Sequence, residues 1–329
     1  MAEPVGTKAA TTPTATESIR TPTGRERNTG HPATTLTRMS KTQPAPVTGV
    51  HQIDSGTCEL APDLIAGGWL LTINGAHSSH IDPDDPLLLD FDYMRQMVAV
   101  IEQRHEPPAP LRVLHLGGAA CSLPRYLAAR YPNARQVAVE VDATLARLVR
   151  EWFALPRSPL LRIRVGDARE VLEAAHDDSR DVIVRDAFSD AVTPDHLTTR
   201  EFTGHAHRVL APGGLYLANC GDDRTLRRAR AEVATVADTF ANTAIIADPS
   251  MLKGRRTGNV VIVGSDGPLD ADPALVRRLL SDALPSSLVV GEQVRAFGSR
   301  PVLRDPEPSR VHSGLPPIAD SNRPPGGAG

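Results

Sequence analysis

The 329-residue chain has few cysteines, little net charge and no long apolar run. Its three cysteines, Cys58, Cys121 and Cys220, are widely spaced and odd in number, which argues against a disulfide framework or a metal site. The formal net charge of −3 gives no sign of a nucleic-acid or anionic-membrane partner. No apolar run approaches a membrane span, and the N-terminus lacks an apolar signal core. We therefore expect a cytoplasmic protein that binds neither nucleic acid nor membrane.

Both ends of the chain have few large apolar side chains. Residues 1–50 are rich in Thr, Pro, Ala and charged residues, and residues 305–329 contain Pro-Pro and Gly-Gly pairs. Such segments cannot bury enough apolar surface to offset the conformational entropy lost on ordering. We predict disordered tails at 1–50 and 305–329, with a small β-hairpin unit at 51–86 and the main domain at 87–304.

The hydrophobic pattern of the predicted β-hairpin unit has a period close to two, which is typical of strands. Strands are predicted at 57–60, 69–73 and 78–81. Asn74-Gly75 between the last two is a strong hairpin-turn signal. The pattern then changes to helical spacing, which predicts a helix from Leu87 to about Gln103.

A strand, a tight turn and a helix are predicted around residues 112–127. The apolar run 113–116 ends at Gly117-Gly118, and Leu123 and Leu127 follow at helical spacing. Glycine lets the backbone approach a ligand without a Cβ in the way, and the start of the helix offers unpaired N–H groups. A glycine pair after a strand is commonly a simple turn, but this one is placed to hold a nucleotide-like ligand.

Acidic residues follow the next three predicted strands. Glu140 ends the strand 135–141, Asp167 follows the strand 162–165, and Asp186 and Asp190 follow the strand 181–184. Glu140 lies a little over twenty residues after the glycines, where an acid can accept hydrogen bonds from the hydroxyls of a ribose. Because parallel strands end at one edge of a sheet, the glycine pair and these acids are predicted to share that edge.

The remaining sequence continues the alternation of strands and helices. Further strands are predicted at 215–219, 243–247 and 260–263, and helices at 199–210 and 224–240. The loop 248–258 is too short for a crossover helix, so the last two strands should pair antiparallel. The sequence therefore predicts an α/β fold: a seven-stranded, doubly wound, mostly parallel sheet of Rossmann-like type, preceded by the small β unit.

Five segments carry a family resemblance: 113–118, 137–142, 166–168, 181–188 and 210–214. In this order they resemble the class I S-adenosylmethionine-dependent methyltransferase fold and, within it, the spermidine synthase family of polyamine aminopropyltransferases. The resemblance includes the β unit, where 71–75 and 79–82 are similar to that family's Leu-Asp-Gly hairpin and the segment after it. It implies that residues 87–304 form an S-adenosylmethionine-dependent transferase-like core.

The resemblance implies a transferase of polyamine biosynthesis that passes an aminopropyl group to a small-molecule amine. Its co-substrate would be S-adenosylmethionine or the decarboxylated form, with no metal. The cofactor-binding residues would be Gly117 and Gly118 at the nucleoside, Glu140 at the ribose and Asp167 at the adenine amino group. Asp186 would be the catalytic proton acceptor and Asp190 a ligand of the amine. The family's β unit often contributes to dimer contacts, which implies a possible homodimer.

Other functions stay open at this stage, because the sequence departs from the family pattern. Ala120 takes the place of the acid in the family's glycine loop, Asn74 that of the Asp in its hairpin, and Ser78 that of a Gln. One alternative is a methyltransferase that uses S-adenosylmethionine on a small molecule, and another is a non-catalytic member of the fold. The acids at several strand ends favour an enzyme over the last alternative.

A few polar residues are interpreted as structural. His115 lies within an apolar strand and is predicted to be a packing residue, and Cys121 is predicted to be a small packing residue at the start of a helix. His77 and His80 have no Cys or acid at metal-ligand spacing, so no metal site is predicted there.

Overall fold

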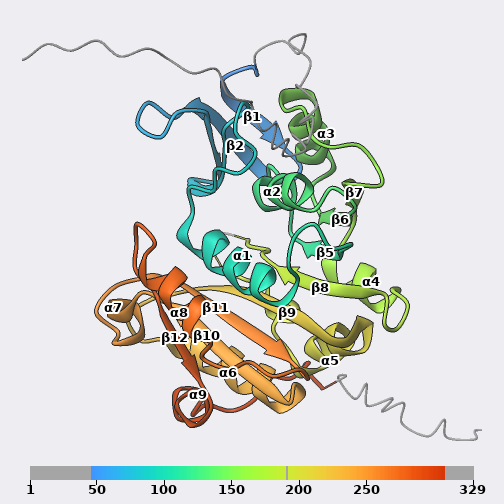
Figure 1. Cartoon of the computed structure of the whole chain (residues 1–329). Helices are drawn as coiled ribbons and strands as arrows, with labels where there is room; N and C mark the ends of the chain where they lie inside the picture. Colours follow the sequence, from blue (N-terminus) through green and yellow to red (C-terminus); the bar gives the residue numbers. More distant parts are fainter. Residues whose placement is uncertain (1–45, 190–191, 308–329) are drawn as a thin grey trace, which may run out of the picture. The chain divides into compact units, whose positions relative to one another are not determined.

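The computed structural model describes residues 46–189 and 192–307 (Figure 1). In these residues a four-stranded antiparallel sheet precedes an eight-stranded sheet that carries helices on both faces. The α/β class, the mostly parallel central sheet and the small N-terminal β unit agree with the prediction. In the described part of the chain, no helix is both long and apolar enough to cross a membrane.

The small sheet contains four strands in sequence order, one more than predicted. They are β1 (Gly49–Ile53), β2 (Gly56–Pro62), β3 (Trp69–Ile73) and β4 (Ala76–Ile81). Asn74 and Gly75 between β3 and β4 have φ of 47° and 82°, the left-handed values that a tight type I′ hairpin turn requires. The predicted hairpin is therefore confirmed. β1 begins inside the segment predicted to be a tail and pairs antiparallel with β2.

The large sheet has the strand order β12-β10-β11-β9-β8-β5-β6-β7. Its strands are β5 (Arg112–Leu116), β6 (Arg135–Glu140), β7 (Arg162–Val165), β8 (Arg180–Arg185), β9 (Leu210–Asp222), β10 (Asn242–Ala247), β11 (Gly258–Ser265) and β12 (Ser287–Val290). β5 to β9 form the parallel part, and β10 and β11 pair antiparallel as predicted. The eighth strand, β12, was not predicted, because four residues are too few to show a period, and it pairs with β10 at the sheet edge.

Helices cover both faces of the large sheet (Figure 1). They are α1 (Asp92–Arg104), α2 (Ser122–Arg130), α3 (Ala143–Trp152), α4 (Ala168–Glu173), η1 (a 3₁₀ turn, Asp195–Leu197), α5 (Arg200–Val209), α6 (Arg227–Thr239), α7 (Pro249–Leu252), α8 (Pro273–Leu280) and α9 (Glu292–Phe297). Successive strand residues point to opposite faces. Leu114 and Leu116 accordingly pack with residues of α4, α5 and α6, whereas Val113 packs with residues of α1, α2 and α8.

A third core joins the small sheet to the large one. Leu60 and Leu71 of the small sheet belong to the same buried cluster as Val149 and Trp152 of α3. Polar contacts continue this junction: the Ala120 N–H donates to Ser79 Oγ at 3.1 Å, and Ser122 Oγ donates to the carbonyl of His80 at 2.7 Å. The β3–β4 hairpin is thereby attached directly to the segment that follows the glycine turn.

Candidate functional site

A cavity of about 620 Å³ lies at the carboxyl ends of β5 to β8. Gly117, Gly118, Glu140, Asp167 and Asp186 all line it. The volume is in the range of small-molecule and cofactor sites. The parallel topology therefore brings together these predicted site residues from four strand ends. The sixth predicted site residue, Asp190, lies outside the described residues.

The turn after β5 can be made only with glycine at its first position. Gly117 has φ of +100°, and a Cβ built on it would lie 2.1 Å from the carbonyl oxygen of Asp186. Gly118 is different, because its nearest neighbour would be the Cβ of Ala138 at 3.6 Å. The Asp186 N–H also donates to the carbonyl of Leu116 at 2.8 Å. The turn and the end of β8 are therefore in direct contact at the floor of the cavity.

Glu140 is held by backbone N–H groups at the end of β6. Its Oε2 accepts from Ala119 N at 3.0 Å and from Gly118 N at 3.4 Å, and its Oε1 accepts from Asp142 N at 3.1 Å. Removal from bulk water raises the pKa of the Glu140 carboxyl, and these backbone donors offset part of the increase. The carboxyl group is thus fixed next to the glycine turn, on the cavity wall.

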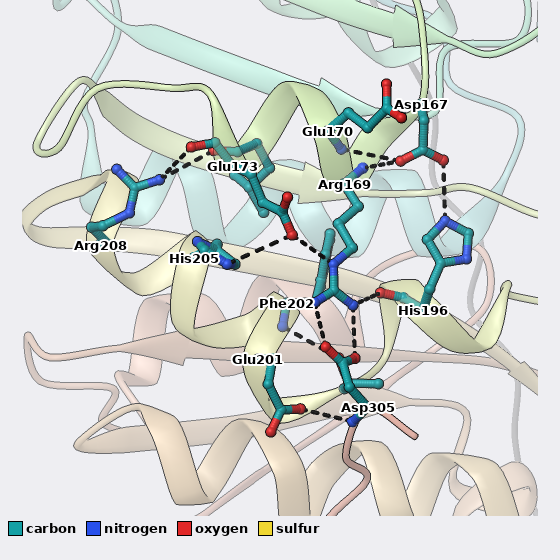
Figure 2. Close-up of polar contacts among 12 residues, drawn as sticks. Asp167, Arg169, Glu170, Glu173, His196, Glu201, Phe202, His205, Arg208 and Asp305 are labelled. Carbon is teal, nitrogen blue, oxygen red and sulfur yellow. Dashed lines mark hydrogen bonds and ion pairs between the residues drawn. The ribbon is translucent and has the colours of Figure 1, made fainter. Parts of the chain in front are cut away.

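Asp167 caps the N-terminus of α4 (Figure 2). Its Oδ1 accepts from Arg169 N at 2.8 Å and from Glu170 N at 3.1 Å, and its Oδ2 lies 3.1 Å from His196 Nε2. Partial burial raises the pKa of Asp167, but hydrogen bonds have a larger effect and hold the pKa below its ordinary value. The donors are the Glu170 N–H, His196 and the Arg169 N–H. Asp167 therefore remains a carboxylate. His196 also lines the cavity and was not predicted as a site residue.

Asp186, at the end of β8, is bonded by two side chains from other segments. Its Oδ2 accepts from the Tyr93 hydroxyl at 3.0 Å, and its Oδ1 accepts from Asn219 Nδ2 at 2.9 Å. Burial raises the pKa of the Asp186 carboxyl, and the Asn219 and Tyr93 bonds offset part of that increase. A carboxylate with a raised pKa is better suited to accept a proton near neutral pH.

Sequence reasoning did not identify Tyr93 and Asn219 as site residues. Tyr93 lies in the first turn of α1, directly after an acid-rich loop, and Asn219 is the last residue of the strand predicted at 215–219. The rule that found Glu140, a polar residue at the carboxyl end of a strand, would also have found Asn219. Ala120, where the family's loop acid was expected, is fully buried in the core shared with the small sheet.

The described residues that line the cavity carry four carboxyl groups and include neither Lys nor Arg. The carboxyl groups belong to Asp92, Glu140, Asp167 and Asp186. A concave surface lined by one sign of charge attracts ligands of the opposite sign. The cavity therefore favours a cationic ligand. Among residues 46–189 and 192–307, no group of three or more His, Cys, Asp or Glu side chains is placed to hold a metal ion.

Two residues interpreted as structural are buried in the structure. His115 Nε2 contacts Gln136 Oε1 at 2.9 Å, and burial lowers the pKa of this imidazole to about 4. Although His115 borders the cavity, it is neutral at pH 7. Burial likewise raises the pKa of the Cys121 thiol to about 12, so it forms no reactive thiolate. Both predictions are confirmed.

The arrangement of strands, turn and acids around the cavity identifies the fold class of the protein. A parallel sheet with a glycine turn after one strand and an acid at the end of the next is typical of the doubly wound α/β folds. The solved structure of spermidine synthase from Thermotoga maritima shares this fold. It superposes with a TM-score of 0.53 at 18% identity, over 77% of this chain and 84% of that chain. The class is thus that of the doubly wound α/β fold of this structure.

Relatives with higher sequence identity to this chain show its family. The structure of a probable spermidine synthase from Corynebacterium glutamicum is 44% identical, with a TM-score of 0.76, over 80% of this chain and 99% of that chain. A polyamine aminopropyltransferase from Vibrio vulnificus is 32% identical over 140 residues, which are 42% of this chain and 46% of that protein. The chain belongs to the spermidine synthase-like family.

No family model matches the chain. The chain spans about half the length of the curated relatives it matches, 46% of one polyamine aminopropyltransferase and 56% of another, from Chromobacterium violaceum.

Proposed function

We propose that the protein is an aminopropyltransferase that transfers the aminopropyl group of decarboxylated S-adenosylmethionine to a small amine. The observation that carries this proposal is the Asp186 carboxyl group, which burial gives a raised pKa and which shares one acidic cavity with Glu140 and Asp167. Relatives with the names spermidine synthase and polyamine aminopropyltransferase support the same reaction class.

The nucleoside half of the co-substrate is assigned to the ends of β5, β6 and β7. Gly117 and Gly118 let the nucleoside approach the backbone, and Glu140 accepts hydrogen bonds from the ribose hydroxyls. Asp167, held ionised by the N-terminus of α4 and by His196, accepts from the amino group of adenine. These carboxylates also favour the positive charge of the sulfonium.

The reaction is assigned to Asp186. The amine nitrogen attacks the carbon next to the sulfonium, so that a C–N bond forms and the C–S bond breaks. The bonding pair moves to sulfur, methylthioadenosine leaves, and the proton of the attacking amine passes to Asp186. Tyr93 and Asn219 hold both carboxylate oxygens, which orients the proton acceptor before the reaction.

The amine is assigned to the side of the cavity formed by α1 and the β3–β4 hairpin. Asp92 supplies a further carboxyl group in this lining, beside Tyr93. Asp190, which the family resemblance assigns to the amine, keeps that role in the proposal. An amine that enters as a cation can be held only where carboxylates offset the cost of removing it from water.

The proposal is tested by product analysis. The protein is incubated with labelled S-adenosylmethionine or its decarboxylated form, each with putrescine and a panel of other amines. We expect methylthioadenosine to form only from the decarboxylated form and only when an amine is present. S-Adenosylhomocysteine formed from S-adenosylmethionine would instead establish the methyltransferase alternative. Binding without either product would point to a non-catalytic member of the fold.

A further inference from the structure

Arg169 connects the nucleoside end of the cavity to the C-terminal segment of the described chain (Figure 2). Its Nη1 donates to Asp305 Oδ1 at 2.7 Å, and its Nη2 donates to the other oxygen of the same carboxylate. Its Nε donates to Glu173 Oε1 at 2.7 Å, and its Nη1 also reaches the carbonyl of His196 at 3.2 Å. One guanidinium thus holds α4, η1 and the C-terminal segment together.

The C-terminal segment is itself fixed by backbone hydrogen bonds. The Asp305 N–H donates to Glu201 Oε2 at 2.9 Å. Two residues earlier, the Leu303 N–H donates to Thr235 Oγ1 at 2.9 Å, and the Leu303 carbonyl accepts from Arg200 N at 2.8 Å. Asp305, where the predicted tail begins, is therefore anchored to α5 and α6. A bidentate Arg–carboxylate pair on such an anchored segment has a defined geometry.

Within this network only Asp167 and His196 line the cavity. The backbone donors of α4 bind Asp167 Oδ1, which leaves Oδ2 for His196 and a ligand. When His196 Nε2 donates its proton to Oδ2, the carboxylate presents only acceptor sites to the cavity. An exocyclic amino group matches these sites, whereas a carbonyl oxygen at the same place is repelled.

We propose that His196 and the Arg169–Asp305 pair position the Asp167 carboxylate, so that the C-terminal segment takes part in selecting an amino-substituted base. This inference rests on the proposed function, because it concerns the base of the same co-substrate. Arg169 and Asp305 act through Asp167 and His196 and are positioning residues. The carbonyl of His196 is fixed by Arg169, and the guanidinium of Arg169 is in turn fixed by Asp305.

The inference is tested by calorimetry with methylthioadenosine and with methylthioinosine, which carries a carbonyl oxygen in place of the amino group. Asp305→Asn removes the ion pair with Arg169. We expect it to weaken methylthioadenosine binding about ten-fold, the ratio that corresponds to about 1.4 kcal/mol. The preference over methylthioinosine should decrease, while kcat and the KM for the amine stay unchanged. Asp305→Glu keeps the charge and should restore most of the affinity.

A matched control removes a similar ion pair elsewhere. Arg112 on β5 pairs with Asp181 on β8, and neither residue lines the cavity or contacts the C-terminal segment. Asp181→Asn should therefore leave both nucleoside affinities at the wild-type values. His196→Ala should decrease the preference for methylthioadenosine, because Asp167 Oδ2 then loses its donor while Oδ1 stays bonded to the backbone of α4.

The outcomes separate this inference from the proposed function. Wild-type affinities and an unchanged preference in Asp305→Asn and His196→Ala would overturn the inference and leave the function intact. A second outcome would also overturn the inference: Asp305→Asn lowers kcat, raises the KM for the amine and weakens both nucleosides equally, and Asp305→Glu restores none of these. That result would show a general structural role. If the wild-type protein binds neither nucleoside, the proposed function fails and the inference fails with it.

Discussion

Two carboxyl groups of the cavity, those of Asp167 and Asp186, are held in different ways. At the end proposed to bind the nucleoside, Asp167 accepts from the N–H groups of the next residues in the chain, and its pKa is below the ordinary value. At the other end, Asp186 is held by side chains from distant segments, and burial raises its pKa. Carboxyl groups whose environments separate their pKa values take different roles. The comparison supports the proposed roles, a binding group at Asp167 and a proton acceptor at Asp186.

The largest expected effect is at the end assigned to chemistry. Asp186→Asn keeps the shape of the side chain but cannot accept the proton of the amine. We expect kcat to fall about 10²- to 10⁴-fold, the usual contribution of a general base. Methylthioadenosine affinity should change little, because Glu140 and Asp167 are intact. Steady-state kinetics combined with calorimetry measures both quantities, and full activity in this variant would show that another group accepts the proton.

A pH profile of Tyr93→Phe is the control for this assignment. The Tyr93 hydroxyl lowers the pKa of Asp186, so its removal should raise that pKa further. Asp186 must be ionised to act, and a higher pKa means that protonation begins at a higher pH. The acid limb of kcat/KM should accordingly move to higher pH. An acid limb at the wild-type position would exclude Asp186 as the titrating group.

A smaller effect is expected at the glycine turn, where the two ends meet. In Gly117→Ala the new methyl group would lie 2.1 Å from the Asp186 carbonyl oxygen, at a φ of +100°. We expect the free energy of unfolding to fall by about 3 kcal/mol. Gly118→Ala is the matched control, because its Cβ meets nothing closer than 3.6 Å. Denaturant unfolding of both variants tests this, and equal losses would contradict the special role of Gly117.

The smallest effect is expected at the nucleoside end. Glu140→Gln keeps one oxygen acceptor and removes the negative charge at the ribose position. We expect methylthioadenosine affinity to decrease about ten-fold, or about 1.4 kcal/mol, with kcat at saturation unchanged. Glu59→Gln, an exposed change on β2, serves as the control in the same calorimetry. A decrease in kcat with unchanged affinity would contradict the assignment of Glu140 to binding and would place it in the chemical step.

The sequence determined which residues meet at the carboxyl edge of the parallel strands. Four of these residues could be found because each lies at or just after the end of a predicted strand, and parallel strands share one carboxyl edge. They are Gly117, Glu140, Asp167 and Asp186. The Asn74-Gly75 hairpin could be found because its left-handed turn needs those residue types. Both inferences use only chain neighbours and a general rule of topology.

Only the tertiary structure decided which side chains surround these acids. Tyr93 bonds to Asp186 across 93 residues of chain, and Arg169 pairs with Asp305 across 136. No local pattern predicts such pairs, because a residue's periodicity shows which face it occupies and not which side chain lies opposite. Packing of α1 against the sheet, and of the C-terminal segment against α4, α5 and α6, creates these contacts.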